Sequence, residues 1–212
     1  MWKYITLITL LFLLIGILLF YFQPWKKTTT HEALLTNNIG GVFPGLVLFD
    51  IDNTLTTGTD NENVVQTVLN SGLAVGICTA NSSYTMETIK NRSWMPNNLW
   101  QFIRKHNDIT FNNVGSGFLM GKSNMHLYKS LHSQIPLGID IYGYRKGFAL
   151  ETTGNSLGIQ NPKYMILCDD LTPFIKAVHV YNPNLSIICS GKDCGGHLTV
   201  QNVQKTISML FN

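Results

Sequence analysis

Charged residues are scarce in this sequence. Only 13% of the 212 residues are Asp, Glu, Lys or Arg, and the formal net charge of +3 is spread along the chain without a dense block of Lys or Arg. Nucleic-acid-binding domains gather basic residues on one face or along one helix, so we expect no nucleic-acid partner. The chain also lacks an internal repeat, and its 45% apolar content suits one globular domain with an appendage.

The longest stretch without any charge lies at the N-terminus. Residues Tyr4 to Phe22 form an uncharged run of 19 residues, which as a helix is about long enough to cross the hydrocarbon core of a bilayer. Aromatic residues bracket it, as they do at membrane interfaces: Trp2, Tyr4, Tyr21, Phe22 and Trp25. A cleaved signal peptide is the alternative, but its apolar core is shorter and ends in small residues.

We therefore predict an uncleaved, single-pass membrane anchor over residues 1–25 and a linker over 26–44. The side of the membrane on which the domain lies stays open, because Lys3 and the α-amine are balanced by Lys26 and Lys27 across the run.

Only four cysteines are present, and they leave the redox compartment open. Cys78 and Cys168 lie within apolar runs, which favours buried core positions. Cys189 and Cys194 are five residues apart and suit a local disulfide in an oxidising lumen. A zinc site that also used His197 would lack a fourth ligand.

Short apolar runs alternate with helix-like segments over residues 45–212, which predicts an α/β domain with a Rossmann-like parallel sheet flanked by helices. The expected strands are Gly45–Ile51, Leu73–Cys78, Ile109–Phe111, Tyr164–Cys168 and Leu185–Cys189. The expected helices are Glu62–Ser71, one capped by Ser82 or Ser83 and ending near Lys90, Leu99–His106, His126–His132, Lys146–Thr153, one opened by Thr172-Pro173, and a last one capped by Thr199.

The segment 94–143 is less regular than the rest of the domain. Gly115, Gly117 and Gly121 indicate a hairpin or loop, and Pro136–Gly143 reads as loop or strand. Only 29 residues separate Asp50 from Thr79, too few for a large inserted cap domain, so a small cap or lid within 94–143 is the remaining possibility.

The most informative motif follows the first strand. Leu46–Phe49 lead directly into Asp50-Ile51-Asp52-Asn53-Thr54-Leu55. A strand that continues through this motif aims Asp50 and Asp52 the same way. Two carboxylates that close together repel each other, but they suit a divalent cation, or a division of labour in which one attacks and the other handles protons. Two further apolar strands end in Thr79 and in Asp169-Asp170.

In chain order, the Asp-Ile-Asp-Asn-Thr strand end, Thr79, a Lys and Asp169-Asp170 resemble the haloacid dehalogenase-like hydrolases, a superfamily of aspartate-nucleophile phosphatases. The resemblance covers about Gly45 to Leu171. It implies a Mg²⁺-dependent phosphomonoester hydrolase, and an acid at position 52 favours a phosphatase over a dehalogenase.

The resemblance also implies a role for each matching residue. Asp50 acts as nucleophile and Asp52 as general acid and base, while Thr79 and Lys146 bind the transferring phosphoryl group. Asp50, Asp52 through its backbone carbonyl, and Asp169 hold Mg²⁺, and Asp170 supports or replaces Asp169.

The lysine has an alternative in Lys122, but Lys146 is preferred because 23 residues before Asp169 leave room for one helix, a turn and a strand. Two other functions stay open: a catalytically silent, membrane-anchored binding module, and a phosphotransferase or phosphomutase on the same scaffold. The substrate is a phosphorylated molecule of unknown size.

Overall fold

The computed structural model describes residues 43–191, 194 and 196–211. The predicted anchor over 1–25 and nearly all of the linker over 26–44 lie outside the described residues. Among the residues that are described, no helix has the length and apolar character needed to span a bilayer.

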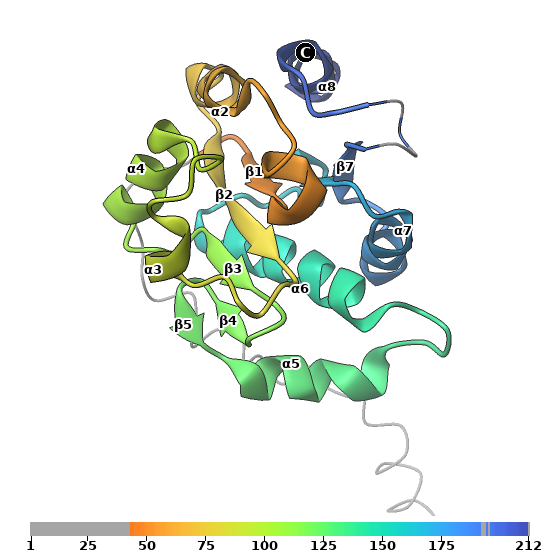
Figure 1. Cartoon of the computed structure of the whole chain (residues 1–212). Helices are drawn as coiled ribbons and strands as arrows, with labels where there is room; N and C mark the ends of the chain where they lie inside the picture. The colour runs from red at the N-terminus through yellow and green to blue at the C-terminus, as the bar shows by residue number, and fades with distance from the viewer. Residues whose placement is uncertain (1–42, 192–193, 195, 212) are drawn as a thin grey trace, which may run out of the picture. The chain divides into compact units, whose positions relative to one another are not determined.

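A seven-stranded sheet forms the centre of the domain, in the order β5-β4-β3-β2-β1-β6-β7 (Figure 1). Five neighbouring strands are parallel: β3, β2, β1, β6 and β7. Strands β4 and β5 extend the β3 edge of the sheet in antiparallel orientation. The strands are β1 Leu46–Phe49, β2 Ala74–Thr79, β3 Phe111–Asn113, β4 Phe118–Leu119, β5 Lys122–Ser123, β6 Met165–Asp169 and β7 Ser186–Cys189. The α/β, Rossmann-like class expected from the sequence is therefore confirmed.

Helices cover both faces of this sheet (Figure 1). On one face α2 packs against α4 and α8, and on the other α6 packs against α7. The helices are α2 Asn61–Asn70, α3 Met86–Ile89, α4 Asn97–Lys105, α5 Met125–Leu131, α6 Ile141–Ser156, α7 Thr172–Tyr181 and α8 Val200–Phe211. Because both faces are covered, β1, β2 and β6 are buried at every position.

Strand β1 is the point at which the chain changes direction across the sheet. Strands β2 and β3 follow it on one side, and β6 and β7 are added on the other. Open α/β sheets bind their ligands in the crevice outside the carboxyl ends of the strands at such a switch point. The ends of β1 and β6 are therefore the place to look for a site.

Helix α6 departs most from the sequence-based expectation. A helix over Lys146–Thr153 was expected, with loop or strand before it, but the helix begins at Ile141, five residues earlier. Asp140 caps it, since its Oδ1 accepts hydrogen bonds from the backbone of Tyr142 and Gly143 at 2.8 and 2.9 Å.

The expected stop at Gly154 is also wrong, because this glycine serves packing within α6. A Cβ at Gly154 would lie 2.5 Å from Met165 Sδ, and one at Gly143 would lie 2.6 Å from Phe174 Cα. Glycine lets α6 approach β6 and α7 this closely, despite its low helix propensity.

The ends of several other helices and strands also differ from those predicted from the sequence. Strand β1 ends two residues before Ile51, and β3 begins at Phe111 rather than Ile109, after a turn in which Asn107 and Asp108 have positive φ. Helix α3 is capped by Thr85 in a capping box with Thr88, not by Ser82 or Ser83. Leu171, not Thr172, holds the cap position of α7. The cap of α8 is confirmed, since Thr199 Oγ1 accepts from Asn202 N at 3.2 Å.

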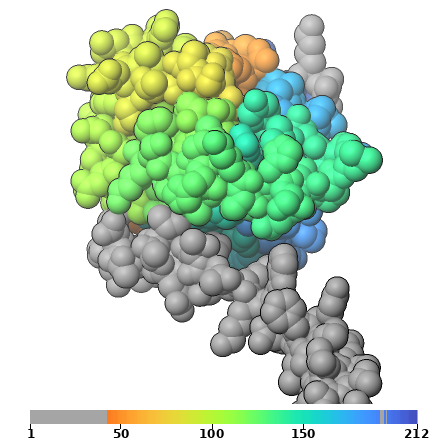
Figure 2. All heavy atoms as spheres, turned by 90° about the horizontal axis from the view of Figure 1, so that it is seen from below, coloured from red at the N-terminus to blue at the C-terminus, as the bar shows by residue number. Residues whose placement is uncertain are grey.

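The irregular segment 94–143 contributes α4, β3, β4, β5 and α5. The glycine-rich part forms the β4–β5 hairpin, whose turn residues Met120 and Gly121 both have positive φ. The three strands of the segment 94–143, β3, β4 and β5, continue the central sheet. Seen from below, α5 and the residues around it form a broad part of the molecular surface (Figure 2).

Candidate active site

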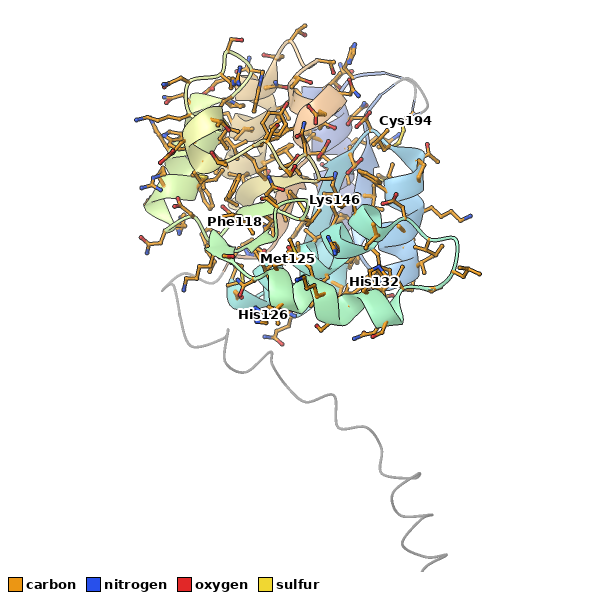
Figure 3. All side chains as sticks on the ribbon, turned by 60° about the horizontal axis from the view of Figure 1, so that its bottom comes forward. Phe118, Met125, His126, His132, Lys146 and Cys194 are labelled. Atoms are coloured by element: carbon orange, nitrogen blue, oxygen red, sulfur yellow. A yellow bond between two sulfur atoms is a disulfide. The ribbon has the colours of Figure 1, made fainter. Side chains whose placement is uncertain are left out.

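Three of the predicted residues meet outside the carboxyl ends of β1 and β6. Lys146 Nζ lies 2.7 Å from Asp50 Oδ1 and 2.6 Å from Asp169 Oδ2. The Lys146 and Asp169 side chains are fully buried and that of Asp50 is nearly so. In Figure 3, Lys146 lies in the interior of the molecule. Lys122 is exposed on β5, so Lys146 is the lysine that the fold brings to these acids.

The backbone around Asp50 fixes this carboxylate at the sheet edge. Asp50 N donates to Cys168 O at 2.9 Å, which ties the end of β1 to β6. The chain then turns at once: Thr56 N donates to Ile51 O at 3.0 Å, and Asn53 adopts a left-handed φ of 55°. Asn tolerates that conformation better than most residues because its short side chain forms local hydrogen bonds.

The motif also contacts the loop after β7. Thr54 Oγ1 lies 3.1 Å from Ser190 Oγ in a buried hydrogen bond, and Ser190 N donates to Asp169 O at 2.9 Å. Cys189, the residue before this serine, is joined to Cys194 by a disulfide. The loop after β7 therefore supports both the β1 turn and the end of β6.

Burial dominates the electrostatics of Asp50. It raises the pKa of this carboxyl to about 7, against the attraction of the Lys146 ammonium, and the charge of Asp169 adds to the rise. Burial alone would lower the pKa of Lys146, but the charges of Asp50 and Asp169 outweigh it and hold that pKa above its usual range. Lys146 therefore stays positively charged between its two acids.

A third carboxylate completes a cluster that fits a metal ion. Asp50, Asp169 and Asp170 each offer one oxygen, and these oxygens all lie within 4.8 Å of one another. Opposite ligands of an octahedral Mg²⁺ lie about 4.2 Å apart, so small side-chain movements bring the three oxygens onto one ion.

The hydrogen bonding and charge of the cluster also suit a cation. Asp170 Oδ1 is buried and has no hydrogen-bond partner, which is unusual for a carboxylate oxygen. Burial and then the Asp169 charge raise the pKa of Asp170, against the smaller opposing effect of the Lys146 ammonium. When all three carboxylates are ionised, one ammonium leaves two negative charges uncompensated, which a divalent cation matches.

Asp52 lies outside this carboxylate cluster. Because β1 ends at Phe49, the strand geometry expected through Asp52 is wrong. Its Oδ1 accepts a hydrogen bond from Tyr84 Oη at 2.7 Å and its Oδ2 accepts one from Asn81 Nδ2 at 3.0 Å. Burial, and then the bond to Asp52, raise the pKa of Tyr84 to about 12, so this tyrosine remains a donor at neutral pH.

Thr79 ends β2 beside these groups. Its side chain is buried, and Oγ1 accepts a hydrogen bond from Asn81 N at 3.2 Å. Asn81 thus contacts Thr79 through its backbone and Asp52 through its side chain. The hydroxyl, the carboxylate and the 79–84 loop form one hydrogen-bonded unit.

The sequence analysis missed four supporting residues: Asn81, Tyr84, Asn113 and Ser190. Asn113 Nδ2 donates to Asn81 O at 2.9 Å and to Tyr84 O at 2.6 Å, which fixes the 79–84 loop. A signal for Asn81 exists, since polar residues directly after a buried strand are candidates for the same sheet edge. Tyr84 and Ser190 carry no such signal.

The histidines that the structure describes lie outside the carboxylate cluster. His126 and His132 are exposed along and after α5 (Figure 3).

Comparisons of the chain with protein-family models, curated proteins and solved structures find no match. Any function therefore has to be argued from the residues and the geometry described above.

Proposed function

We propose that this protein is a Mg²⁺-dependent phosphomonoester hydrolase of the haloacid dehalogenase-like type, tethered to a membrane by residues 1–25. The observation that supports it most directly is the Lys146 ammonium held between Asp50 and Asp169 at 2.7 and 2.6 Å, with Asp170 beside them. The sequence order of these groups and their meeting at a switch point are both typical of such enzymes.

In the proposed reaction, Asp50 attacks the phosphorus atom of a phosphomonoester. A bond forms between an Asp50 carboxylate oxygen and phosphorus while the bond from phosphorus to the ester oxygen breaks, which gives an aspartyl phosphate and an alcohol. Asp52 donates the proton that the leaving oxygen takes up. Its partial exposure leaves it accessible to substrate and water, and its bonds to Tyr84 and Asn81 hold it in place.

In the second step, Asp52 accepts a proton from water as the water attacks the phosphorus atom. The bond between phosphorus and the Asp50 oxygen breaks, inorganic phosphate leaves, and both carboxyl groups return to their initial states. Lys146 offsets negative charge on Asp50 and on the phosphoryl oxygens, and the Thr79 hydroxyl orients the phosphoryl group by a hydrogen bond.

Asp50, Asp169 and Asp170 are the residues that would hold Mg²⁺, with the backbone carbonyl of Asp52 as a further expected ligand. The ion would supply charge stabilisation for the phosphoryl oxygens and for the Asp50 carboxylate. Its hard oxygen ligands and its retained waters suit two or three carboxylates plus a substrate phosphate.

The experiment is hydrolysis of an aryl phosphate by the full-length chain in mild detergent, with and without Mg²⁺. We expect turnover that requires Mg²⁺ and that falls by at least about 10³-fold in Asp50→Asn, since loss of a nucleophile removes the covalent route. Asp60→Asn, an exposed acid near the start of α2, is the matched control and should keep wild-type activity. Equal activity in Asp50→Asn and wild type would overturn the proposal.

The same preparation separates the two other functions. Phosphate-analogue binding without turnover on any phosphoester would indicate a binding module. Transfer of the phosphoryl group to an added alcohol in preference to water would indicate a phosphotransferase or phosphomutase.

A further inference from the structure

Arg145, the neighbour of Lys146 on α6, is a buried charge without an acidic partner. Only 8% of the residue is exposed, and among the described residues no carboxylate lies within salt-bridge distance of it. Its Nε is buried and has no hydrogen-bond partner. Its Nη1 donates a hydrogen bond to Val114 O at 3.3 Å.

Two tyrosine rings surround the guanidinium. Its central carbon lies 5.5 Å from the ring centre of Tyr128 and 5.8 Å from that of Tyr142. Such contacts favour a cation, but they do not neutralise it, and a guanidinium in a protein stays protonated and offers five N–H donors. Burial of a charge in this state is unfavourable unless a partner arrives.

The position of Arg145 links it to the phosphate-binding side of the site. Val114 joins the two: its carbonyl accepts from Arg145, and its N–H donates to Thr79 O at 2.9 Å. Because one residue spans the two hydrogen bonds, the guanidinium lies within roughly 10 Å of the Thr79 carbonyl.

The loop after β3 adds a second unpartnered group. Ser116 Oγ is buried and has no hydrogen-bond partner. This loop lies directly against the 79–84 loop, since a Cβ on Gly115 would come within 2.0 Å of Ala80 O. A free hydroxyl therefore lies close to the backbone that presents Thr79, two residues beyond the carbonyl bound by Arg145.

We propose that Arg145 and Ser116 form a subsite for a second anionic group of the substrate. The substrate class is then a phosphomonoester whose far end carries a carboxylate or a second phosphate. The guanidinium gives charge-assisted hydrogen bonds to that group, while Lys146 and the carboxylate cluster act on the phosphoryl group that is transferred. This inference rests on the proposed function for the identity of the transferred group.

The test compares pairs of substrates whose far end is charged in one member and esterified in the other: 4-carboxyphenyl phosphate and its methyl ester, and 4-phosphonophenyl phosphate and its dimethyl phosphonate ester. The readout is the ratio of kcat/KM for the charged member to that for the neutral member. We expect wild type to prefer a charged member by about tenfold or more, and the preference to disappear in Arg145→Met, mainly through KM. The two pairs show whether a carboxylate or a phosphate is the better ligand.

Arg104→Met is the matched control, because Arg104 is exposed and paired with Asp108; it should keep the wild-type ratio. Arg145→Lys should retain part of the preference, which separates lost charge from lost packing. A wild-type ratio near one for both pairs, or a ratio unchanged in Arg145→Met, would overturn the inference.

A protein without turnover still permits the test. Binding of the same pairs to wild type and to Arg145→Met is then measured by calorimetry. A preference for the charged member that Arg145→Met abolishes supports the subsite even if the proposed hydrolysis fails. Equal binding of both members contradicts the subsite, whatever the outcome for hydrolysis.

Discussion

The carboxylates on the two sides of the site lie in contrasting environments. On the β1 and β6 side, Asp50 and Asp169 are buried and share one ammonium. On the β2 side, Asp52 is partly exposed and bonded to the neutral donors Tyr84 and Asn81. Two acids two residues apart in sequence thus have different environments: Asp50 is buried against an ammonium, and Asp52 is partly exposed to solvent. This difference is the physical basis for giving them separate roles.

The largest effect is expected from removing the Lys146 ammonium, which Asp50 and Asp169 share on the β1 and β6 side of the site. Lys146→Met leaves two buried carboxylates without their cation, and loss of one partner of a buried ion pair costs about 3–5 kcal/mol of stability. We expect the unfolding temperature to fall by roughly 10 °C and hydrolysis to be lost. The measurement is thermal unfolding followed by circular dichroism. Lys122→Met, at an exposed lysine on β5, is the control, and equal unfolding temperatures for the two variants would contradict the account.

On the β2 side, substitution of Asp52 should affect catalysis and not stability. Asp52→Asn removes the general acid and base, so kcat should drop by about 10²- to 10⁴-fold. The unfolding free energy should change by no more than about 1 kcal/mol, because the side chain is partly exposed. The drop should be smaller for aryl phosphates with acidic leaving groups, which need no proton. A loss of kcat that is the same for all leaving groups would argue against this role.

The stability that the β1 and β6 side contributes through Asp50 should also depend on pH. Burial raises the pKa of Asp50 from 3.8 to about 7, so folding favours its protonated form. The resulting stability is fully present below about pH 4 and is lost as the pH rises through about 7. Without divalent cations, the unfolding temperature should therefore fall by a few degrees between pH 5 and 8. Addition of Mg²⁺ should reduce this fall, and Asp50→Asn should remove it; an identical pH profile in Asp50→Asn contradicts the assignment.

A smaller effect is expected where the loop after β7 meets the carboxylate cluster. Gly191 has a φ of +133°, and a Cβ there would lie 2.9 Å from Asp170 Cβ. Gly191→Ala should displace Asp170 and lower the affinity for Mg²⁺ by about tenfold, as measured by calorimetry. Gly196→Ala is a close control, since Gly196 has a φ of +137° and open space around its Cβ position. Equal losses in both variants would show that backbone strain, and not contact with Asp170, is responsible.

The centre of the parallel sheet was predictable because β1, β2 and β6 come from short apolar runs, which a sheet covered on both faces requires. The ends of those runs also indicated Asp50, Thr79 and Asp169, because the carboxyl ends of parallel strands meet at one edge. The start of α6 was not predictable in this way. Its glycines read as helix breakers in sequence, whereas their use is close packing against Phe174 and Met165, which only the tertiary fold specifies.

The partners of the site residues were harder to predict than the residues themselves. The separation of Asp52 from Asp50 depends on a turn that Asn53 makes at a φ of 55°, and no periodic pattern signals it. The bond from Tyr84 to Asp52 spans 32 residues and that between Thr54 and Ser190 spans 136. Contacts of this range follow from the topology of the sheet, which the local sequence does not encode.

The central claim is that Asp50 carries the phosphoryl group during turnover. The most direct measurement is mass spectrometry of Asp52→Asn, quenched in acid during reaction with a nitrophenyl phosphate and Mg²⁺. An acidic leaving group lets the first step proceed without Asp52, and the missing base slows the second step, so the intermediate accumulates. The account predicts a phosphoryl group on Asp50 and none in Asp50→Asn. A phosphoryl group on another residue, or turnover with no enzyme-bound phosphate at any time, would contradict it.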